Sequence, residues 1–433
     1  MLKAPHPAAQ ILLRSLAPLK KAVCPVRSYL PRLASPPFFS TDKDEPEEEL
    51  SERVVIPVQT RSEDEQQSQD ARDKGLFLAR QERWDDIVTA ITQADRTRSA
   101  TGAGLPIADI LAFGARSDVM HGTEQALENC PTPDDAPLLA GIMALEEARL
   151  SMGSNPIMNA VVALAHVDLG WAWRSDAAMN LAAQTFENRA QAHFKRAWTL
   201  MQPLHDAATD SPFLLSAYCT AMATQKQPPV RLADAFAQLI ELDPLNFRNM
   251  RALGAAMAPS RTGSCEALEL EARRTAVRTQ EIWGAGGYTW TYFDALTTED
   301  QACLSLDVPF FMEGLRDIVE NRPSQETVNL LIAFCAVGLD LREDAAPEVD
   351  IVRETIARAS DWLVRDHLQE IHPLHWAHAS VGFANNAQIP SPQRFAARGR
   401  ANAHRFLQQC FREELAKGHQ VQFTRSGLEV LPN

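Results

Sequence analysis

Histidines are concentrated in one short stretch of this 433-residue chain, where they could bind a metal. Within residues 367–378 (HLQEIHPLHWAH) the groups capable of ligation are His367, Glu370, His372, His375 and His378. Zinc needs three or four such groups converging as a tetrahedron, and a catalytic zinc keeps one position open. The spacing is not that of an HExxH motif, and Pro373 divides the group across a turn. Solvated or hydrogen-bonded histidines are the ordinary alternative. We therefore expect no bound cofactor and name His372, His375 and His378 as the metal candidates.

A second unusual stretch, residues 283–294 (WGAGGYTWTYFD), gathers aromatic side chains around three glycines. One hypothesis is a groove that stacks against a peptide or small ligand. Its lining would be Arg278, Trp283, Tyr288, Trp290 and Tyr292. Alanine at Tyr288 and Trp290 would then weaken partner capture and leave thermal stability nearly intact. The alternative is a helix break whose aromatics fill the core, since aromatic clusters pack more often than they bind.

His166 and Asp168 form a third candidate, as an acid–base pair. A separation of two residues places them on different faces of a helix, which disfavours direct cooperation. The chain contains no nucleophile elbow, dinucleotide fingerprint or kinase signature. Helical folds can still assemble carboxylates from distant helices. A hydrolase-like, metal-dependent helical enzyme therefore stays open as the alternative to a protein without catalytic activity.

The elements that position these residues are predicted to be helices. Alanine and leucine are abundant, β-branched and aromatic residues are sparse, and alternating apolar–polar runs are nearly absent. This composition is typical of an all-α protein. With 45% apolar residues, the chain can bury a large core.

Residues 232–254 (LADAFAQLIELDPLNFRNMRALG) carry the clearest helical pattern. Leu232, Phe236 and Leu239 share one face of a helix. The Asp-Pro pair at 243–244 ends it, because proline disfavours helical geometry in the preceding residue. A second helical pattern follows, with Gly254 on or beside its apolar face, where a missing side chain lets two helices approach closely. Together the two helices make an αα-hairpin.

This hairpin resembles a tetratricopeptide-type repeat. Its Leu-Asp-Pro turn and the Ala-Leu-Gly at 252–254 look like the end of one repeat and the start of the next. Weaker matches lie at 71–96, 308–338 and 351–384. Helix-ending prolines recur at 212, 244, 323 and 373, an irregular spacing where regular repeats recur about every 34 residues. We therefore predict an irregular α-solenoid of stacked antiparallel helix pairs. The resemblance implies a concave surface that binds proteins or peptides.

Three segments follow from these patterns. Residues 1–68 are predicted to be a disordered tail, basic and then acidic, and residues 69–420 the helical repeat domain. Residues 421–433 form a short extension, in which apolar and polar residues alternate on either side of a turn at 425–427. That alternation predicts a small β-hairpin.

The net charge of −14 disfavours nucleic-acid binding, which usually needs a basic face, and suggests basic partners. Residues 1–41 differ, since they contain basic residues and no acid. Such a start is typical of an organelle transit peptide, and also of a disordered tail or of residues before the true start. Anchoring to a membrane surface through residues 11–23 is a further alternative. No apolar stretch is long enough to predict a transmembrane segment.

The cysteines are odd in number, scattered and without a CxxC spacing, which favours a reducing compartment and no disulfide framework. We therefore predict a cytoplasmic protein, or a mitochondrial-matrix protein if the organism is eukaryotic and residues 1–41 are a transit peptide. The predicted function is a non-enzymatic scaffold or adaptor for a protein or peptide partner.

Overall fold

Helices dominate the part of the chain that the structure describes. The computed structural model describes residues 53–129, 135–177, 183–339, 345–383, 391–425 and 427–432. Across these residues the protein is all-α apart from one small sheet, as its composition predicts. No helix among them has the length and apolar character that crossing a membrane requires. The predicted basic segment, residues 1–41, lies outside the described residues.

The chain forms its helices in an almost unbroken series. The first are α2 (Glu63–Arg80), α3 (Trp84–Arg96), α4 (Ile107–Asn129), α5 (Asp135–Ser151), α6 (Pro156–Ala177), α7 (Ala183–Met201) and α8 (Pro212–Ala223), with the short 3-10 turns η3 (Gln202–Leu204) and η4 (Asp206–Ala208) before α8. Then come α9 (Pro229–Leu242), α10 (Phe247–Met257), α11 (Cys265–Trp283), α12 (Gly286–Thr298), α13 (Asp300–Ser305), α14 (Val308–Asn321) and α15 (Gln325–Ala333), which continues into a π-helical turn, η5 (Phe334–Gly338). The last are α16 (Pro347–Ala357), α17 (Ala359–His367), α18 (Pro373–Val381), α19 (Pro392–Cys410) and α20 (Arg412–Ala416).

Polar side chains begin many of these helices by accepting hydrogen bonds from otherwise unpaired backbone amides. Ser62 and Glu65 form a reciprocal capping box at the start of α2. Single caps stand before α8, α10, α11, α14, α15 and α19; they are Ser211, Asn246, Ser264, Asp307, Ser324 and Ser391. The starts of these capped helices are therefore fixed locally.

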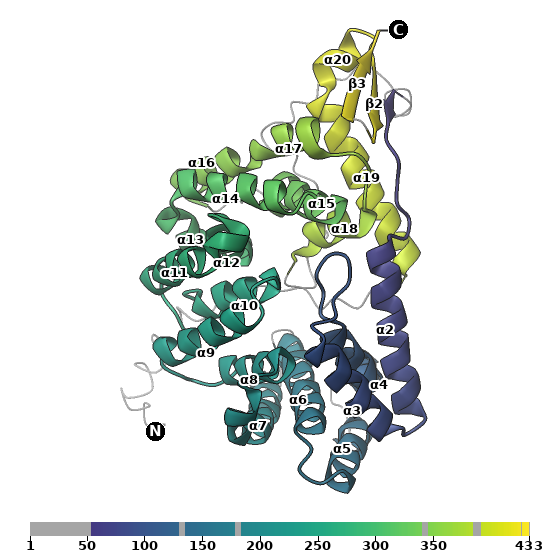
Figure 1. Cartoon of the computed structure of the whole chain (residues 1–433), viewed down its shortest axis with the longest axis vertical. Helices are drawn as coiled ribbons and strands as arrows, with labels where there is room; N and C mark the ends of the chain where they lie inside the picture. The colour runs from purple at the N-terminus through teal and green to yellow at the C-terminus, as the bar shows by residue number, and fades with distance from the viewer. Residues whose placement is uncertain are drawn as a thin grey trace, which may run out of the picture.

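Helices pack mainly against the next one or two along the chain, as α2 does with α4, α10 with α12, and α15 with α17. Figure 1 shows that this succession curves, so that α2 and the late helices α18 and α19 lie on the same side of the molecule. One large apolar core extends through the series, from Val54 to Phe423. Buried cysteines 219, 303 and 335 belong to it, as their apolar sequence neighbours predict.

A three-stranded sheet joins the two ends of the described chain. β2 (Gln420–Thr424) and β3 (Gly427–Leu431) form the antiparallel hairpin that the alternating pattern predicts. β1 (Val54–Val55) pairs in parallel with β2, with Val54 opposite Val421. Residues 53–68 are therefore part of the folded structure, and the predicted boundary at residue 69 is wrong. The local sequence is acidic and predicts a tail, but its partners lie far along the chain.

Several predicted helix pairs are confirmed. The pair at 232–254 corresponds to α9 and α10, separated at Asp243 and Pro244, and the pair at 308–338 corresponds to α14 and α15. The pair at 71–96 corresponds to α2 and α3, although α2 begins earlier, at its Ser62 cap. Residues 351–384 differ, because α16 and α17 occupy the part expected as one helix.

Gly254 allows α10 and α12 to touch. A methyl group at this position would overlap the backbone carbonyl of Thr291 in α12. The Gly254→Ala variant should therefore lose about 1–3 kcal/mol of unfolding free energy, the usual effect of overpacking a core. Gly122→Ala in α4 is the matched control, since the added methyl group meets no atom within 4 Å. Urea unfolding of both variants tests this, and equal stabilities would contradict it.

Candidate functional site

The aromatic stretch lies in the core and not in a groove. Tyr288, Trp290 and Tyr292 are fully buried, and Trp283 is 3% exposed. Every residue from Gly286 to Leu296 in α12 is buried, because α10, α11 and α14 all pack around this helix. The groove hypothesis is therefore wrong for these side chains, and the alternative of a core-filling cluster describes them.

Specific contacts hold each of these groups in place. The Trp283 indole N–H donates to the Pro244 carbonyl at 2.8 Å, and Trp290 stacks on Phe247. Tyr288 and Tyr292 both donate to one carboxylate oxygen of Glu269, at 2.7 Å each. Burial, with that carboxylate beside them, raises the pKa of both tyrosines.

Arg278 is not grouped with the aromatics. Its guanidinium pairs with Glu241 on α9 at 3.0 Å. The bend that the glycines predict is limited to Gly284, with a φ of +55°, and α12 begins two residues later.

Trp290→Ala should lower the free energy of unfolding by about 3–5 kcal/mol, the usual cost of removing a large buried aromatic side chain. Val277→Ala, at an exposed position of α11, is the control and should change it little. Thermal unfolding of both variants measures the difference. A Trp290→Ala variant as stable as wild type would contradict this core role.

His166 and Asp168 face different partners, as their spacing predicts. His166 hydrogen-bonds His193 through the two Nδ1 atoms at 2.8 Å and Glu146 through Nε2 at 3.2 Å. Asp168 accepts from Arg116 at 2.6 Å. Burial, together with the neighbouring His166, lowers the pKa of His193 to about 4. His166 and His193 are therefore a buried, neutral pair of histidines, and His166 and Asp168 do not form an acid–base couple.

His193 should make the protein less stable in mild acid. Its folded pKa lies below the value of about 6.5 for an unfolded histidine, so the unfolded chain takes up the proton first. Stability is fully present above pH 6.5, and we expect His193 to remove about 2–3 kcal/mol of it by pH 4. Urea unfolding across this range should show a weaker pH dependence for His193→Asn. His205→Asn, at a side chain that is 42% exposed, should behave like wild type. If the free energy of unfolding changes equally with pH in all three proteins, the assignment is refuted.

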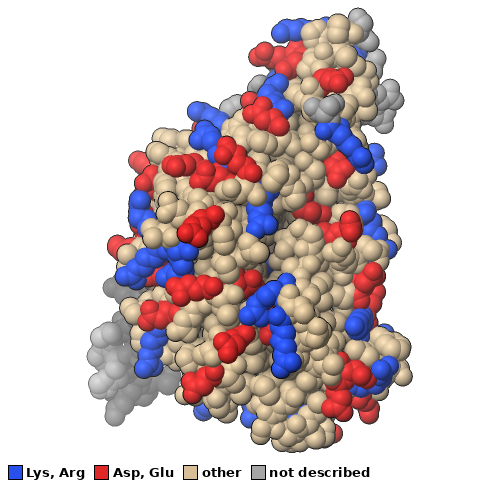
Figure 2. Space-filling model, viewed as in Figure 1, with Lys and Arg blue, Asp and Glu red and all other residues tan. Residues whose placement is uncertain are grey.

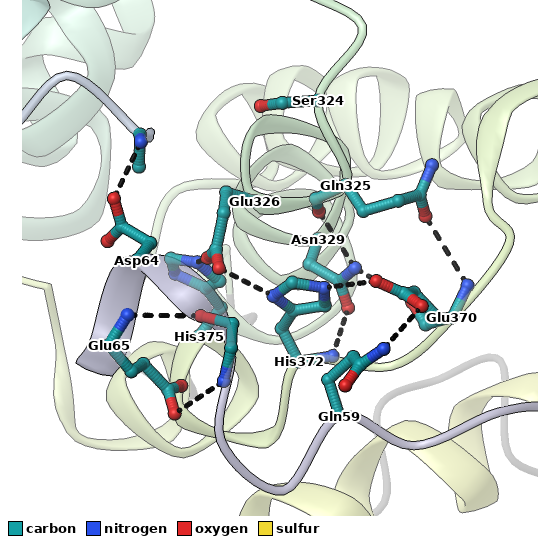
Figure 3. A network of polar contacts seen from close by, with 12 residues as sticks. Gln59, Asp64, Glu65, Ser324, Gln325, Glu326, Asn329, Glu370, His372 and His375 are labelled. Carbon is teal, nitrogen blue, oxygen red and sulfur yellow. Dashed lines mark hydrogen bonds and ion pairs between the residues drawn. The ribbon is translucent and has the colours of Figure 1, made fainter. Parts of the chain in front are cut away.

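The histidine stretch at 367–378 does converge on a carboxylate, but one that comes from another helix. Glu326, in the first turn of α15, faces His372 and His375 at the start of α18 (Figure 3). Its Oε1 lies 2.8 Å from His372 Nδ1, and its Oε2 lies 2.6 Å from His375 Nε2. These three side chains could hold a metal ion, since their ligand atoms all lie within 4.8 Å of one another.

The other histidines of the stretch lie elsewhere. His378 packs edge-on against Phe395 of α19, and His367 against Trp362 of α17. The prediction that His378 joins His372 and His375 is therefore wrong, because Pro373 starts a helix that turns His378 toward α19. Glu326 is the residue that sequence reasoning missed. No local signal points to it, since the rest of α15, η5, α16 and α17 separate it from His372 along the chain.

A second layer of hydrogen bonds holds His372 in position. Its Nε2 lies 3.0 Å from Glu370 Oε1, and Gln59 donates to the other oxygen of Glu370 at 2.9 Å (Figure 3). Asn329 accepts from the His372 backbone N–H and from the Trp376 indole, and it donates to the Glu370 carbonyl. The network thus connects α15 and α18 with the N-terminal segment.

The charges of this network reinforce one another. Burial alone would raise the pKa of Glu326, but His372 and His375 hold it well below its usual range. Burial would likewise lower the pKa of His372, but Glu326 and Glu370 raise it overall. Burial raises the pKa of nearby Glu65, and the negative charge of Glu326 adds to this effect.

Two cavities lie close to these elements. A cleft of about 450 Å³ opens beside the network and is lined by Pro57, Gln59, Gln325, Gln369, Glu370 and Arg425. A second cavity, the central cavity, has a volume of about 460 Å³. It forms where four connections meet: those between α3 and α4, before α8, between α9 and α10, and between α14 and α15. Figure 1 shows the α3–α4 connection reaching into the middle of the molecule. Both volumes are in the range of small-ligand sites.

Comparison with models of protein families, with curated proteins and with solved structures finds no match for this chain. The tetratricopeptide resemblance therefore stays a prediction from the chain's own helix pattern.

Proposed function

We propose that the protein is a non-enzymatic scaffold or adaptor, built as an irregular tetratricopeptide-like α-solenoid, that binds a basic segment of a protein partner in the central cavity. The observation that carries this proposal is the set of acidic groups on the cavity wall, Asp95, Asp109 and Asp243, which outnumber the basic groups Arg98 and Arg322. Burial raises the pKa of Asp109 to about 6 and also raises that of Asp243. A cationic group that enters the cavity would favour the charged form of these carboxylates and so offset the cost of their burial.

The rest of the lining supports a peptide ligand. Leu245 lines the cavity with half of its surface exposed, and so offers an apolar contact beside the acidic groups. Asn249 is buried, and its amide nitrogen has no hydrogen-bond partner among the described residues. An unpaired buried donor at a cavity wall suits a ligand carbonyl. Asp95 lines the same cavity, but its carboxylate already accepts hydrogen bonds from the Ser211 hydroxyl and from the Phe213 backbone amide.

The exterior supports a protein partner over a nucleic acid. Figure 2 shows acidic and basic side chains interspersed on the face in view, which has no continuous basic area. Together with the net charge of −14, this favours basic over acidic partners. The cytoplasm, as a reducing compartment, suits the free cysteines that the structure describes, and we propose it as the location.

Arrayed basic, neutral and acidic peptides, probed with the full chain at pH 7, should give binding only to the basic set. With the best binder in a fluorescence-anisotropy titration, Asp109→Asn should weaken affinity tenfold or more. Asp234→Asn, the same change at an exposed position of α9 outside the cavity, should leave affinity unaltered. Affinity should also fall as the pH is lowered through about 6, because protonated Asp109 cannot pair with a cation.

Equal binding of acidic and basic peptides would contradict the proposal. So would an Asp109→Asn variant with wild-type affinity and wild-type pH dependence. Circular dichroism and thermal unfolding of each variant check that the fold is intact, because Asp109→Asn removes a charge that offsets the buried Arg248.

A further inference from the structure

Three groups that can ligate a metal converge on one point near the start of α18. Glu326 comes from α15, while His372 and His375 stand on either side of the Pro373 that begins α18. His372 is buried, and the side chains of Glu326 and His375 are 13% and 26% exposed. The centre is therefore largely enclosed by protein, yet reachable from solvent past His375.

The contact between His372 and Glu326 is incomplete as a hydrogen bond. His372 Nδ1 and Glu326 Oε1 are 2.8 Å apart, but both are buried atoms without a properly directed hydrogen bond to any described residue. Such unsatisfied buried atoms call for an explanation, and an ion is one of the usual ones. Two atoms bound tetrahedrally to one zinc ion at about 2.1 Å lie about 3.4 Å apart. The observed 2.8 Å is shorter, so these two side chains would have to move slightly apart to bind an ion between them.

The surroundings of His372 also favour ligation through Nδ1. Its Nε2 faces Glu370 Oε1 at 3.0 Å, so the ring proton on Nε2 can be donated to that carboxylate. The lone pair of Nδ1 then faces Glu326. A carboxylate behind the ligating imidazole is the common arrangement in metal centres, where it fixes the tautomer and strengthens the donor.

We propose that Glu326, His372 and His375 bind a divalent transition metal, for which Zn²⁺ is the appropriate probe. Two imidazoles and one carboxylate form the ligand set of several zinc centres that keep a further position for water. The carboxylate charge offsets part of the charge of the ion, and Glu370 offsets more from the second layer. The bound ion would join α15 to α18 and, through Glu370 and Gln59, to the N-terminal segment.

Titration of the chelator-treated full chain with Zn²⁺ tests this proposal. Isothermal calorimetry against a competing chelator should show one Zn²⁺ per chain, and Zn²⁺ should raise the midpoint of thermal unfolding. His375→Ala should lower the affinity at least a hundredfold and abolish the thermal shift. Co²⁺ in place of Zn²⁺ should give visible absorption bands that are characteristic of bound imidazole and carboxylate, and His375→Ala should lack them.

His378→Ala is the matched control, because His378 is on the same helix and packs against Phe395 instead of facing Glu326. It should bind Zn²⁺ as wild type does. Glu326→Gln, which keeps the size of the side chain and removes its charge, is a second variant and should also lose affinity. Absence of stoichiometric Zn²⁺ binding in wild type would overturn the proposal. Equal binding by His375→Ala, Glu326→Gln and His378→Ala would do the same.

Discussion

Residues 53–59 lie along the C-terminal sheet and the connection before α18, where Pro57 and Gln59 exchange backbone hydrogen bonds with Ile371 at 2.8 Å. β1 extends the same junction by pairing with β2. These bonds hold the first described segment against the last elements of a long series of helices. Without them, contacts between neighbouring helices would not determine how the two ends lie. The position of α2, and of the α3–α4 connection that Asp64 holds through the Ala103 amide, depends on this junction.

The polar network beside the junction is favourable only while it is complete. Burying a carboxylate or an imidazolium is costly unless hydrogen bonds and opposite charge compensate it. Glu326, His372 and Glu370 compensate one another's charge, while Asn329 and Gln59 hydrogen-bond to the His372 backbone and to Glu370. The network therefore specifies one arrangement of α15, α18 and the N-terminal segment more than it adds stability. A metal ion would use the same groups and would hold the same elements.

Aspartates near the central cavity show how environment assigns roles to one residue type. Asp95 accepts from the Ser211 hydroxyl and the Phe213 amide, so its charge stabilises the start of α8. Burial raises the pKa of Asp109 to about 6, although Arg248 and Arg116 oppose the shift. Arg248 also loses solvation, which lowers its pKa. A cavity wall with such aspartates is better suited to a charged ligand than to an apolar one.

The sequence by itself determined the local elements. Helical periodicity and the Asp-Pro pair located α9 and α10, and alternation located the β2–β3 hairpin, because these patterns act over a few residues. The tertiary structure decided which faces are covered. The clustered aromatics and glycines left Trp290 between a ligand groove and a core-filling break, and the packing of three helices around α12 made it core. The tertiary structure also decided which groups that are distant in the sequence meet: Glu326 contacts His372, and β1 pairs with β2. Such contacts depend on how the whole series of helices curves, and no short stretch of sequence encodes that path.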